Sequence, residues 1–187
     1  MNTNLTNAIT IAVSHLKQGG VIAYPTEAVY GLGCDPFNEQ AVQRLLKIKQ
    51  RSIAKGLILI AADWQQVQAL TLAIPEERMR EIQASWPGPY TWVFPSSPQA
   101  PSWITGNFKT IAIRITDHPV AQQLCRQFGA PIVSTSANLS GEVPVKDAAA
   151  LPNSLVEQLD FLLTAPTGSS TKPSLIRDAL SGKILRA

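Results

Sequence analysis

The sequence predicts an α/β fold in which one mixed β-sheet is flanked by helices. Short runs rich in β-branched and aromatic residues recur along the chain, and segments with a helical spacing of apolar residues separate most of them. Two runs, 90–94 and 110–115, are joined by a Pro- and Ser-rich loop for which no helix is expected, so the sheet should not be purely parallel. The 187 residues contain no linker, and residues 1–187 are therefore expected to form a single domain.

Six strands and five helices follow from the local patterns. The strands are predicted at residues 21–24, 57–61, 90–94, 110–115, 131–135 and 161–163. A first helix over 6–18 places Ile9, Ala12, Val13 and Leu16 on one face and ends at a pair of glycines. The other helices are expected to start at residues suited to that position, with the last ending before Gly129: Asn38, Asp63, Pro75 and Pro119.

Composition excludes several classes of protein. Apolar residues make up 45% of the chain, which rules out a wholly disordered protein. Cys34 and Cys125 stand alone, so neither a disulfide scaffold nor a structural zinc site is expected. The uncharged stretch 82–108 contains five prolines and cannot form a membrane helix. We therefore expect a soluble, cytoplasmic protein without membrane contact.

Two polar segments precede the middle of the chain, near the ends of predicted strands, where ligands bind in α/β sheets. Residues 24–35 combine hydroxyl groups, a carboxylate and two glycines, Gly31 and Gly33, which permit a close backbone approach to a ligand or a positive φ; a plain strand–turn segment is the alternative. Between Arg44 and Lys55 lie five basic residues and no acidic one. Such cations can stabilise a helix C-terminus, but phosphate recognition explains their number better.

Two later segments add further candidates for anion binding. Arg114 interrupts an apolar run and needs an anionic partner or a pocket, unless it faces solvent on an edge strand. Residues 134–141 bring hydroxyl, amide and backbone N–H groups to a strand end, which suits an anion-binding nest, although ordinary Asx and Ser turns use the same residues. The residues alone thus predict an α/β pocket that binds anions.

Other kinds of site are not supported. Neither His15 nor His118 accompanies a G-x-S-x-G motif, so a serine hydrolase is not expected. The chain has no G-x-x-x-x-G-K-S/T sequence, so any nucleotide is bound without a P-loop. No element carries histidines or carboxylates at metal-ligand spacing, so a dedicated metal site is not expected. The remaining role for a metal is a nucleotide-bound Mg²⁺ that Glu27 or Asp35 contacts.

Five motifs, in this order, resemble the YrdC/TsaC family of threonylcarbamoyl-adenylate synthases in its single-domain bacterial form. They are Tyr-Pro-Thr-Glu-Ala-Val-Tyr-Gly-Leu-Gly-Cys-Asp at 24–35, Lys-Gln-Arg at 49–51 with Lys-Gly-Leu-Ile at 55–58, Trp-Pro-Gly-Pro at 86–89, Ala-Ile-Arg-Ile-Thr-Asp-His-Pro at 112–119 and Ser-Thr-Ser-Ala-Asn-Leu-Ser-Gly at 134–141. The resemblance covers nearly the whole chain. It implies an open, twisted, mixed sheet with helices around it and a basic concave surface.

The resemblance also implies an activity. Such an enzyme condenses L-threonine, bicarbonate (or CO₂) and ATP, accompanied by Mg²⁺, into threonylcarbamoyl-AMP and pyrophosphate. A partner complex would then transfer the threonylcarbamoyl group to the adenosine beside the anticodon of tRNAs that read codons beginning with A. Direct contact with RNA or tRNA is a further implication. The alternative is a non-catalytic RNA-binding or ribosome-maturation factor that uses the basic concave surface.

Roles carry over from the family to the matching positions. Lys49 and Arg51 would be the catalytic cations. Together with them, ATP would be bound by Lys55, Ser134, Ser136, Asn138 and Ser174, the last beside Pro173. The threonine and carbamate end would be lined by Tyr24, Thr26, Tyr30 and Arg114, with Arg114 forked onto a carboxylate. The chain departs from the common family pattern at Ala28, Ser52, Ile60 and Leu175.

Overall fold

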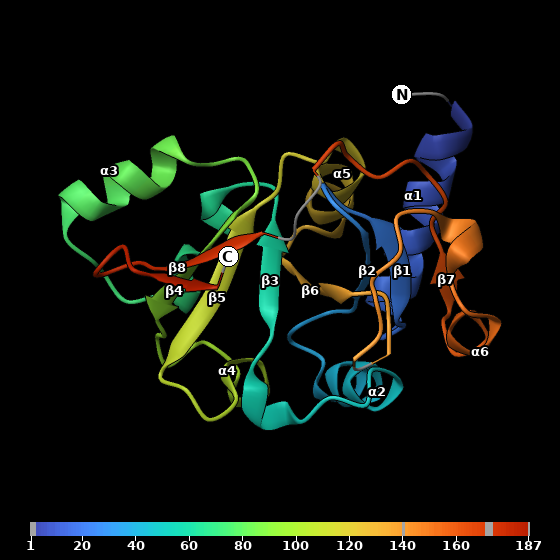
Figure 1. Ribbon diagram of the computed structural model, residues 1–187, viewed down its shortest axis with the longest axis horizontal. Coiled ribbons are helices and arrows are strands. Elements are labelled where there is room, and N and C mark those ends of the chain that lie inside the picture. The colour runs from blue at the N-terminus through green and yellow to red at the C-terminus, as the bar shows by residue number, and fades with distance from the viewer. Residues whose placement is uncertain (1–2, 140, 171–173, 187) are drawn as a thin grey trace.

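One mixed sheet runs through the part of the chain that the structure describes. The computed structural model describes residues 3–139, 141–170 and 174–186. The strand order is β7-β1-β2-β6-β3-β5-β4-β8-β9 (Figure 1). The strands are β1 (Ile22–Pro25), β2 (Tyr30–Gly33), β3 (Ile58–Ala61), β4 (Tyr90–Pro95), β5 (Thr110–Ile115), β6 (Ile132–Ser136), β7 (Phe161–Leu162), β8 (Leu175–Asp178) and β9 (Ile184–Arg186).

The sheet combines both strand directions, as the sequence predicts. β3 and β5 are parallel, as are β1 with β7 and β4 with β8. The pairs β1–β2, β2–β6, β3–β6, β4–β5 and β8–β9 are antiparallel. Strand β6 joins the two halves of the sheet because it pairs with β2 through its last residues and with β3 through its first. The predicted fold class is confirmed.

Helices cover the two faces of the sheet unequally. The helices are α1 (Thr3–Lys17), α2 (Glu39–Ile48), α3 (Glu76–Ala84), α4 (Ser102–Thr105), α5 (Pro119–Phe128) and α6 (Asn153–Val156), with 3₁₀ turns η1 (Ile53–Lys55), η2 (Trp64–Gln66), η3 (Gln68–Leu70) and η4 (Ala148–Ala150). α1 and α5 pack together over Ile22, Ile60 and Ile132. α2, α3 and α4 bury apolar side chains in a second cluster with Leu59 and Ile113, on the other face.

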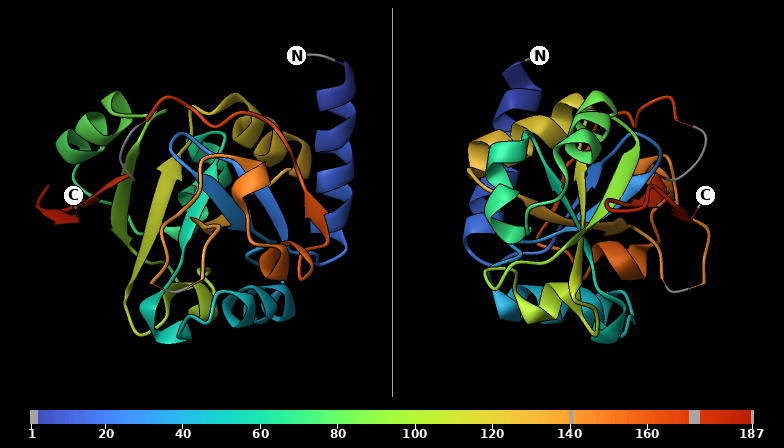
Figure 2. Two further views of the ribbon diagram at one scale, coloured as in Figure 1. Left: turned by 45° about the vertical axis from the view of Figure 1, so that its right-hand side comes forward. Right: turned by 90° about the vertical axis from the view of Figure 1, so that its left-hand side faces the viewer.

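The first helix and the last strand of the described residues lie on opposite sides of the molecule (Figure 2). Figure 2 shows α1 along one edge of the molecule and β9 near the opposite edge. None of the helices in the described residues is both long and apolar enough to cross a membrane.

Three of the predicted helix starts are confirmed in atomic detail. The Asn38 side chain accepts a hydrogen bond from the backbone N–H of Ala41 at 3.1 Å and caps α2. Pro75 precedes the first residue of α3, and Pro119 is the first residue of α5. α5 ends at Gly129, whose φ of 85° is left-handed.

Other predicted elements are wrong or incomplete. The helix expected after Asp63 is replaced by the short turns η2 and η3, because Thr71 already bridges to Ser96 and the backbone N–H of Leu72 bonds to Pro95. The loop between β4 and β5 contains α4, although the sequence predicts no helix there. Residues 30–33, expected in a polar turn segment, form strand β2, and the sequence does not predict β8 and β9.

A close backbone contact at Gly106 fixes the loop that carries Arg51 and Lys55. Gly106 follows α4 with a φ of 61°. A Cβ atom there would lie 2.6 Å from the Ile53 carbonyl oxygen and 2.7 Å from the Ala54 carbonyl oxygen. The backbone N–H of Leu57 also bonds to the Ile104 carbonyl at 2.9 Å, so α4 and η1 are held together by main-chain atoms.

Replacing this glycine should therefore destabilise the protein strongly. Gly106→Ala combines a strained backbone with overpacking against main-chain atoms, and should lower the free energy of unfolding by about 3 kcal/mol or more. Gly129→Ala is the matched control, because its φ is also positive but nothing lies within 4 Å of the added Cβ; it should lose about 1 kcal/mol. Chemical denaturation of both variants tests the difference, and equal losses would contradict it.

Candidate functional site

A cavity of about 360 Å³ opens on the sheet face that α1 and α5 leave partly uncovered. On this face lie Ile58 of β3, Arg114 of β5, and Ser134 and Ser136 of β6, which share a strand face with Ile60 and Ile132 beneath the two helices. In Figure 1 no helix lies in front of the middle of β3. Because Ser134 and Ser136 line it, the cavity lies next to β6, the strand that joins the two halves of the sheet.

The structure brings together nearly all the residues that the sequence nominates. The predicted residues that line the cavity are Thr26, Tyr30, Lys49, Arg51, Lys55, Arg114, Ser134, Ser136, Asn138 and Ser174. They come from segments far apart in the sequence, and the sheet order places these segments side by side. Pro173 and Ser140 lie outside the described residues.

Tyr24 is the predicted site residue that does not line the cavity. Its side chain is fully buried in the cluster with α1 and α5, and its hydroxyl donates to the Val133 carbonyl at 3.3 Å. Burial raises the pKa of this phenol far above its usual value. Gly33 makes room for the ring, since a Cβ atom would lie 2.7 Å from Tyr24 Cε1. Gly33 thus serves core packing, and no positive φ occurs at either Gly31 or Gly33.

Lys49 lies at the C-terminal end of α2 and points into the cavity. Its ammonium donates to the carbonyl oxygen and to Oδ1 of Asn138, both at 2.6 Å, and to Ser136 Oγ at 3.3 Å. The side chain is only 5% exposed and has no carboxylate within ion-pair distance among the described residues. A buried cation held only by neutral oxygens is prepared to bind an anion.

Arg51 follows Lys49 after a sharp turn at Gln50, which has a φ of 51°. Its Nη2 donates to the Gly56 carbonyl at 3.0 Å, while its buried Nε has no hydrogen-bond partner among the described residues. Burial, followed by repulsion from Arg186, lowers the pKa of the guanidinium. The left-handed conformation of Gln50 changes the direction of the chain after α2, so that the side chains of Lys49 and Arg51 both reach the same cavity.

Arg186 is a cavity residue that the sequence analysis missed. It lies on β9 and donates to the Ser174 carbonyl at 3.3 Å. Ser174 is itself held by Thr91 of β4, whose hydroxyl donates to Ser174 Oγ at 3.0 Å. The sequence contains no signal for Arg186, because no motif accompanies it and the strand that carries it, Ile184–Arg186, is not predicted.

The other end of the cavity contains Arg114, Thr26 and Tyr30. Arg114 Nη2 lies 3.2 Å from Glu27 Oε2, so the arginine has the anionic partner that its buried position requires. The Thr26 hydroxyl donates to the Val29 carbonyl at 2.7 Å, and the Tyr30 hydroxyl donates to the Ala165 carbonyl at 2.5 Å. Both hydroxyls therefore hold the wall in place.

The lining of the cavity is strongly cationic. Its basic side chains are Lys49, Arg51, Lys55, Arg114 and Arg186, and no Asp or Glu belongs to the described lining. The described residues also contain no group of three or more His, Cys, Asp or Glu side chains able to hold a metal. Cations, hydroxyls and an amide in one cavity suit a polyanionic ligand such as a nucleoside triphosphate.

A family model described as "Telomere recombination" (Sua5/YciO/YrdC) matches residues 14–187. The chain belongs to the Sua5/YciO/YrdC family. A threonylcarbamoyl-AMP synthase of Coxiella burnetii is 54% identical over 181 residues, 97% of each chain. The structure of P. abyssi Sua5 complexed with L-threonine has a TM-score of 0.86 and 33% identity, covering 91% of this chain and 50% of that one. E. coli YciO has a TM-score of 0.84 and 27% identity, covering 96% and 88%.

Within this Sua5/YciO/YrdC chain, Lys49 should make activity depend on pH. Burial, and then repulsion from Arg51, lower the pKa of Lys49 to about 8, although Glu142 partly opposes the change. If the charged amine binds phosphate, kcat/KM for ATP should be constant below this pKa and fall about tenfold per pH unit above it. Lys49→Arg should shift the fall to higher pH, because guanidinium stays charged. Identical profiles for the two proteins would contradict the assignment.

Stability should respond to pH in the opposite direction. The pKa of Lys49 in the folded chain lies below that of an unfolded lysine, about 10.4. Between these two values the unfolded chain binds more protons, so the Lys49 contribution to stability rises with pH there. A fall in activity above pH 8 would therefore not result from unfolding caused by the titration of Lys49.

Proposed function

We propose that this chain is a threonylcarbamoyl-AMP synthase, converting L-threonine, bicarbonate or CO₂, and ATP into threonylcarbamoyl-AMP and pyrophosphate. The observation that supports this most directly is the cavity in which Lys49, Arg51 and Lys55 stand at one end and the Arg114–Glu27 pair at the other, with Arg186 close enough to both Arg51 and Arg114 for mutual repulsion. Relatives named for this activity match about half of the residues over almost the full chain. A triphosphate and an amino acid carboxylate would each find cations of suitable geometry.

The reaction needs positioning and charge stabilisation more than a protein nucleophile. The threonine amine, after losing a proton, attacks CO₂ and forms a carbamate. A carbamate oxygen then attacks the α-phosphorus of ATP, the bond to the β-phosphate oxygen breaks, and pyrophosphate leaves. Lys49 and Arg51 would stabilise the charge that develops on the phosphates, and Arg114 would orient the threonine carboxylate.

Mg²⁺ would enter with the nucleotide. This ion keeps several waters and binds substrate phosphates with few protein ligands, which fits a cavity lined by hydroxyl and amide oxygens without a carboxylate cluster among the described residues. When bound, the ion would neutralise phosphate charge. Lys49 and Arg51 would add donors on the protein side, and Ser136 and Asn138 would orient the Lys49 ammonium through the bonds described above.

The product would be passed on in the cytoplasm to a complex that modifies tRNA. Threonylcarbamoyl-AMP is a mixed anhydride, so an acceptor amine must receive the threonylcarbamoyl group soon after release. Direct tRNA contact would use exposed cations around the cavity, such as Lys55. Binding of this kind weakens steeply as salt rises, whereas binding of ATP in the cavity should respond less.

Omission of one substrate at a time tests the synthase activity. Purified protein receives ATP, Mg²⁺, L-threonine and bicarbonate, and pyrophosphate release is followed while each component is left out. Release should require both threonine and bicarbonate, and mass spectrometry should detect the threonylcarbamoyl adduct of AMP. Release that is indifferent to threonine would overturn the proposal and favour the RNA-binding alternative.

A further inference from the structure

A buried carboxylate lies directly behind the cationic cavity. Glu27 belongs to the turn between β1 and β2 and is 6% exposed. Its Oε1 accepts hydrogen bonds from Thr116 Oγ1 at 2.6 Å and from the backbone N–H of Asp117 at 3.3 Å. Its Oε2 lies 3.2 Å from Arg114 Nη2. Glu27 is therefore fixed on one side by the end of β5 and faces the guanidinium on the other.

A second segment holds the backbone of Glu27 in place. Residues 164–170 cross over the β1–β2 turn, where the N–H of Gly168 bonds to the Thr26 carbonyl at 2.9 Å and the N–H of Ser170 bonds to the Glu27 carbonyl at 3.0 Å. The contact is close, since a Cβ atom on Gly168 would lie 2.7 Å from the Glu27 carbonyl oxygen. The main chain of Glu27 is thus clamped, and its carboxylate has little freedom to move away from Arg114.

The carboxyl group is ionised in this position. Burial by itself would raise the pKa of Glu27, but Arg114 and the Thr116 hydrogen bond outweigh it, and the pKa lies below its usual value. Among the described residues, Arg114 is the one cavity cation with an ion-pair partner. The cavity consequently has two ends of different charge: Lys49, Arg51 and Lys55 are unpaired at one end, whereas Glu27 neutralises Arg114 at the other, where Arg186 is the neighbouring cation.

Arg114 retains hydrogen-bonding capacity for a ligand. Its Nη2 forms an ion pair with Glu27 Oε2 without a hydrogen bond, and its buried Nε has no hydrogen-bond partner among the described residues. A guanidinium has donors on two edges, so one edge can be held by the protein while another binds a planar carboxylate. A ligand carboxylate at this end would supply the acceptor that the buried donor lacks.

We propose that Glu27 is a positioning residue that orients Arg114 toward the carboxylate of the amino acid substrate and keeps the triphosphate of ATP away from this end of the cavity. This inference rests on the proposed function, in which both ligands share one cavity. The Glu27 carboxylate acts in two ways. It anchors the guanidinium, and its negative charge makes the Arg114 end unattractive to a polyanion while still allowing a single carboxylate to bind.

The experiment compares Glu27→Gln with the wild type by direct ligand titration and by kinetics. The substitution keeps the size of the side chain and an acceptor for Thr116 but removes the charge. Calorimetry should show L-threonine binding weakened about tenfold, the size expected for a misdirected charge-assisted hydrogen bond, while imidodiphosphate, a stable pyrophosphate analogue, binds at least as tightly as before. Glu77→Gln on the exposed face of α3 is the control and should change neither affinity.

The inhibition pattern separates positioning from a purely structural role. In the wild type, imidodiphosphate should compete with ATP only; in Glu27→Gln it should also compete with threonine, because Arg114 is then free to take a phosphate. In an Arg114→Ala background, Glu27→Gln should cause no further loss of threonine binding. Unchanged threonine affinity, or equal losses for both ligands, would overturn the proposal.

A conservative variant guards against a folding defect. Glu27→Asp keeps the charge on a shorter side chain, so threonine binding should weaken less than in Glu27→Gln and the wild-type inhibition pattern should return. The same titrations keep the two proposals apart. Threonine binding without turnover in the wild type would defeat the synthase assignment and leave the role of Glu27 measurable, whereas absence of threonine binding would defeat both.

Discussion

Lys49→Ala and Arg51→Ala should each lower kcat/KM by about 30- to 1,000-fold. This corresponds to about 2–4 kcal/mol of lost transition-state stabilisation, the usual effect of removing one fixed electrostatic donor. Lys49 is buried with its ammonium held by Asn138 and Ser136, and Arg51 has a buried Nε without a partner among the described residues, so each alanine removes a cation that the surrounding residues hold in the cavity. Pyrophosphate release measured at several ATP concentrations gives the result.

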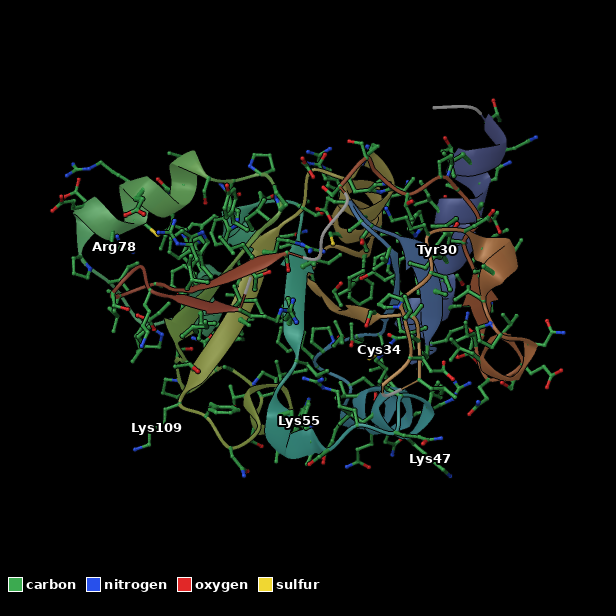
Figure 3. The ribbon with its side chains drawn as sticks, in the orientation of Figure 1. Tyr30, Cys34, Lys47, Lys55, Arg78 and Lys109 are labelled. Atoms are coloured by element: carbon green, nitrogen blue, oxygen red, sulfur yellow. The ribbon has the colours of Figure 1, made fainter. Side chains whose placement is uncertain are left out.

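The control for these two variants is Lys47→Ala. Lys47 lies on the same helix, two residues before Lys49, but it is exposed and extends away from the body of the protein (Figure 3). Its loss should leave kcat/KM within about twofold, since isolated surface charges contribute little. Near wild-type turnover in both Lys49→Ala and Arg51→Ala would rule out their assigned role. A loss in Lys47→Ala of similar size would point to a general effect of net charge.

Arg114→Ala should raise the threonine KM by about 10- to 150-fold and change the ATP KM much less. The expected size is that of a hydrogen-bonded contact with a charged group, about 1.5–3 kcal/mol. The variant also leaves Glu27 buried without its cation, which is expected to lower stability by about 3–5 kcal/mol unless the carboxyl group takes up a proton. Steady-state kinetics with each substrate varied in turn, together with thermal denaturation, measure both effects.

Two companion variants make this result interpretable. Arg126→Ala removes an exposed arginine from α5 and should affect neither KM. Arg114→Lys keeps a cation opposite Glu27 but lacks the planar fork, so it should recover stability while the threonine KM stays raised. Equal increases in the KM of threonine and ATP would place Arg114 elsewhere in the reaction.

Local patterns were sufficient where one residue determines the geometry. The Asn38 cap, the proline at the start of α5 and the glycine at its end are each recognisable from a few neighbouring residues. The prediction after Asp63 failed because the pairing of Thr71 with Ser96, a contact between distant segments, stops the helix. Strand β2 was missed because two of its four residues are glycines, which are depleted in strands.

The site shows the same division between local and distant information. Clusters of basic and hydroxyl residues identified the cavity, because anion binding needs those side chains whatever the fold. The buried orientation of Tyr24 depends on space that Gly33 leaves on the neighbouring strand, and the importance of Glu27 depends on Arg114, which is distant in sequence. Arg186 reaches the cavity only because β9 pairs with β8. Such relationships are set by sheet pairing, which a single sequence does not reveal.

The late position of β8 and β9 has a consequence for the protein during its synthesis. Most of the cavity is built from residues 26–144, but Ser174 and Arg186 belong to the end of the chain, next to and within these last two strands. β8 is held by parallel pairing with β4, where Tyr90 lies opposite Leu175. Residue 186 must therefore emerge from the ribosome before the lining of the cavity is complete, so the cavity forms only at the end of synthesis.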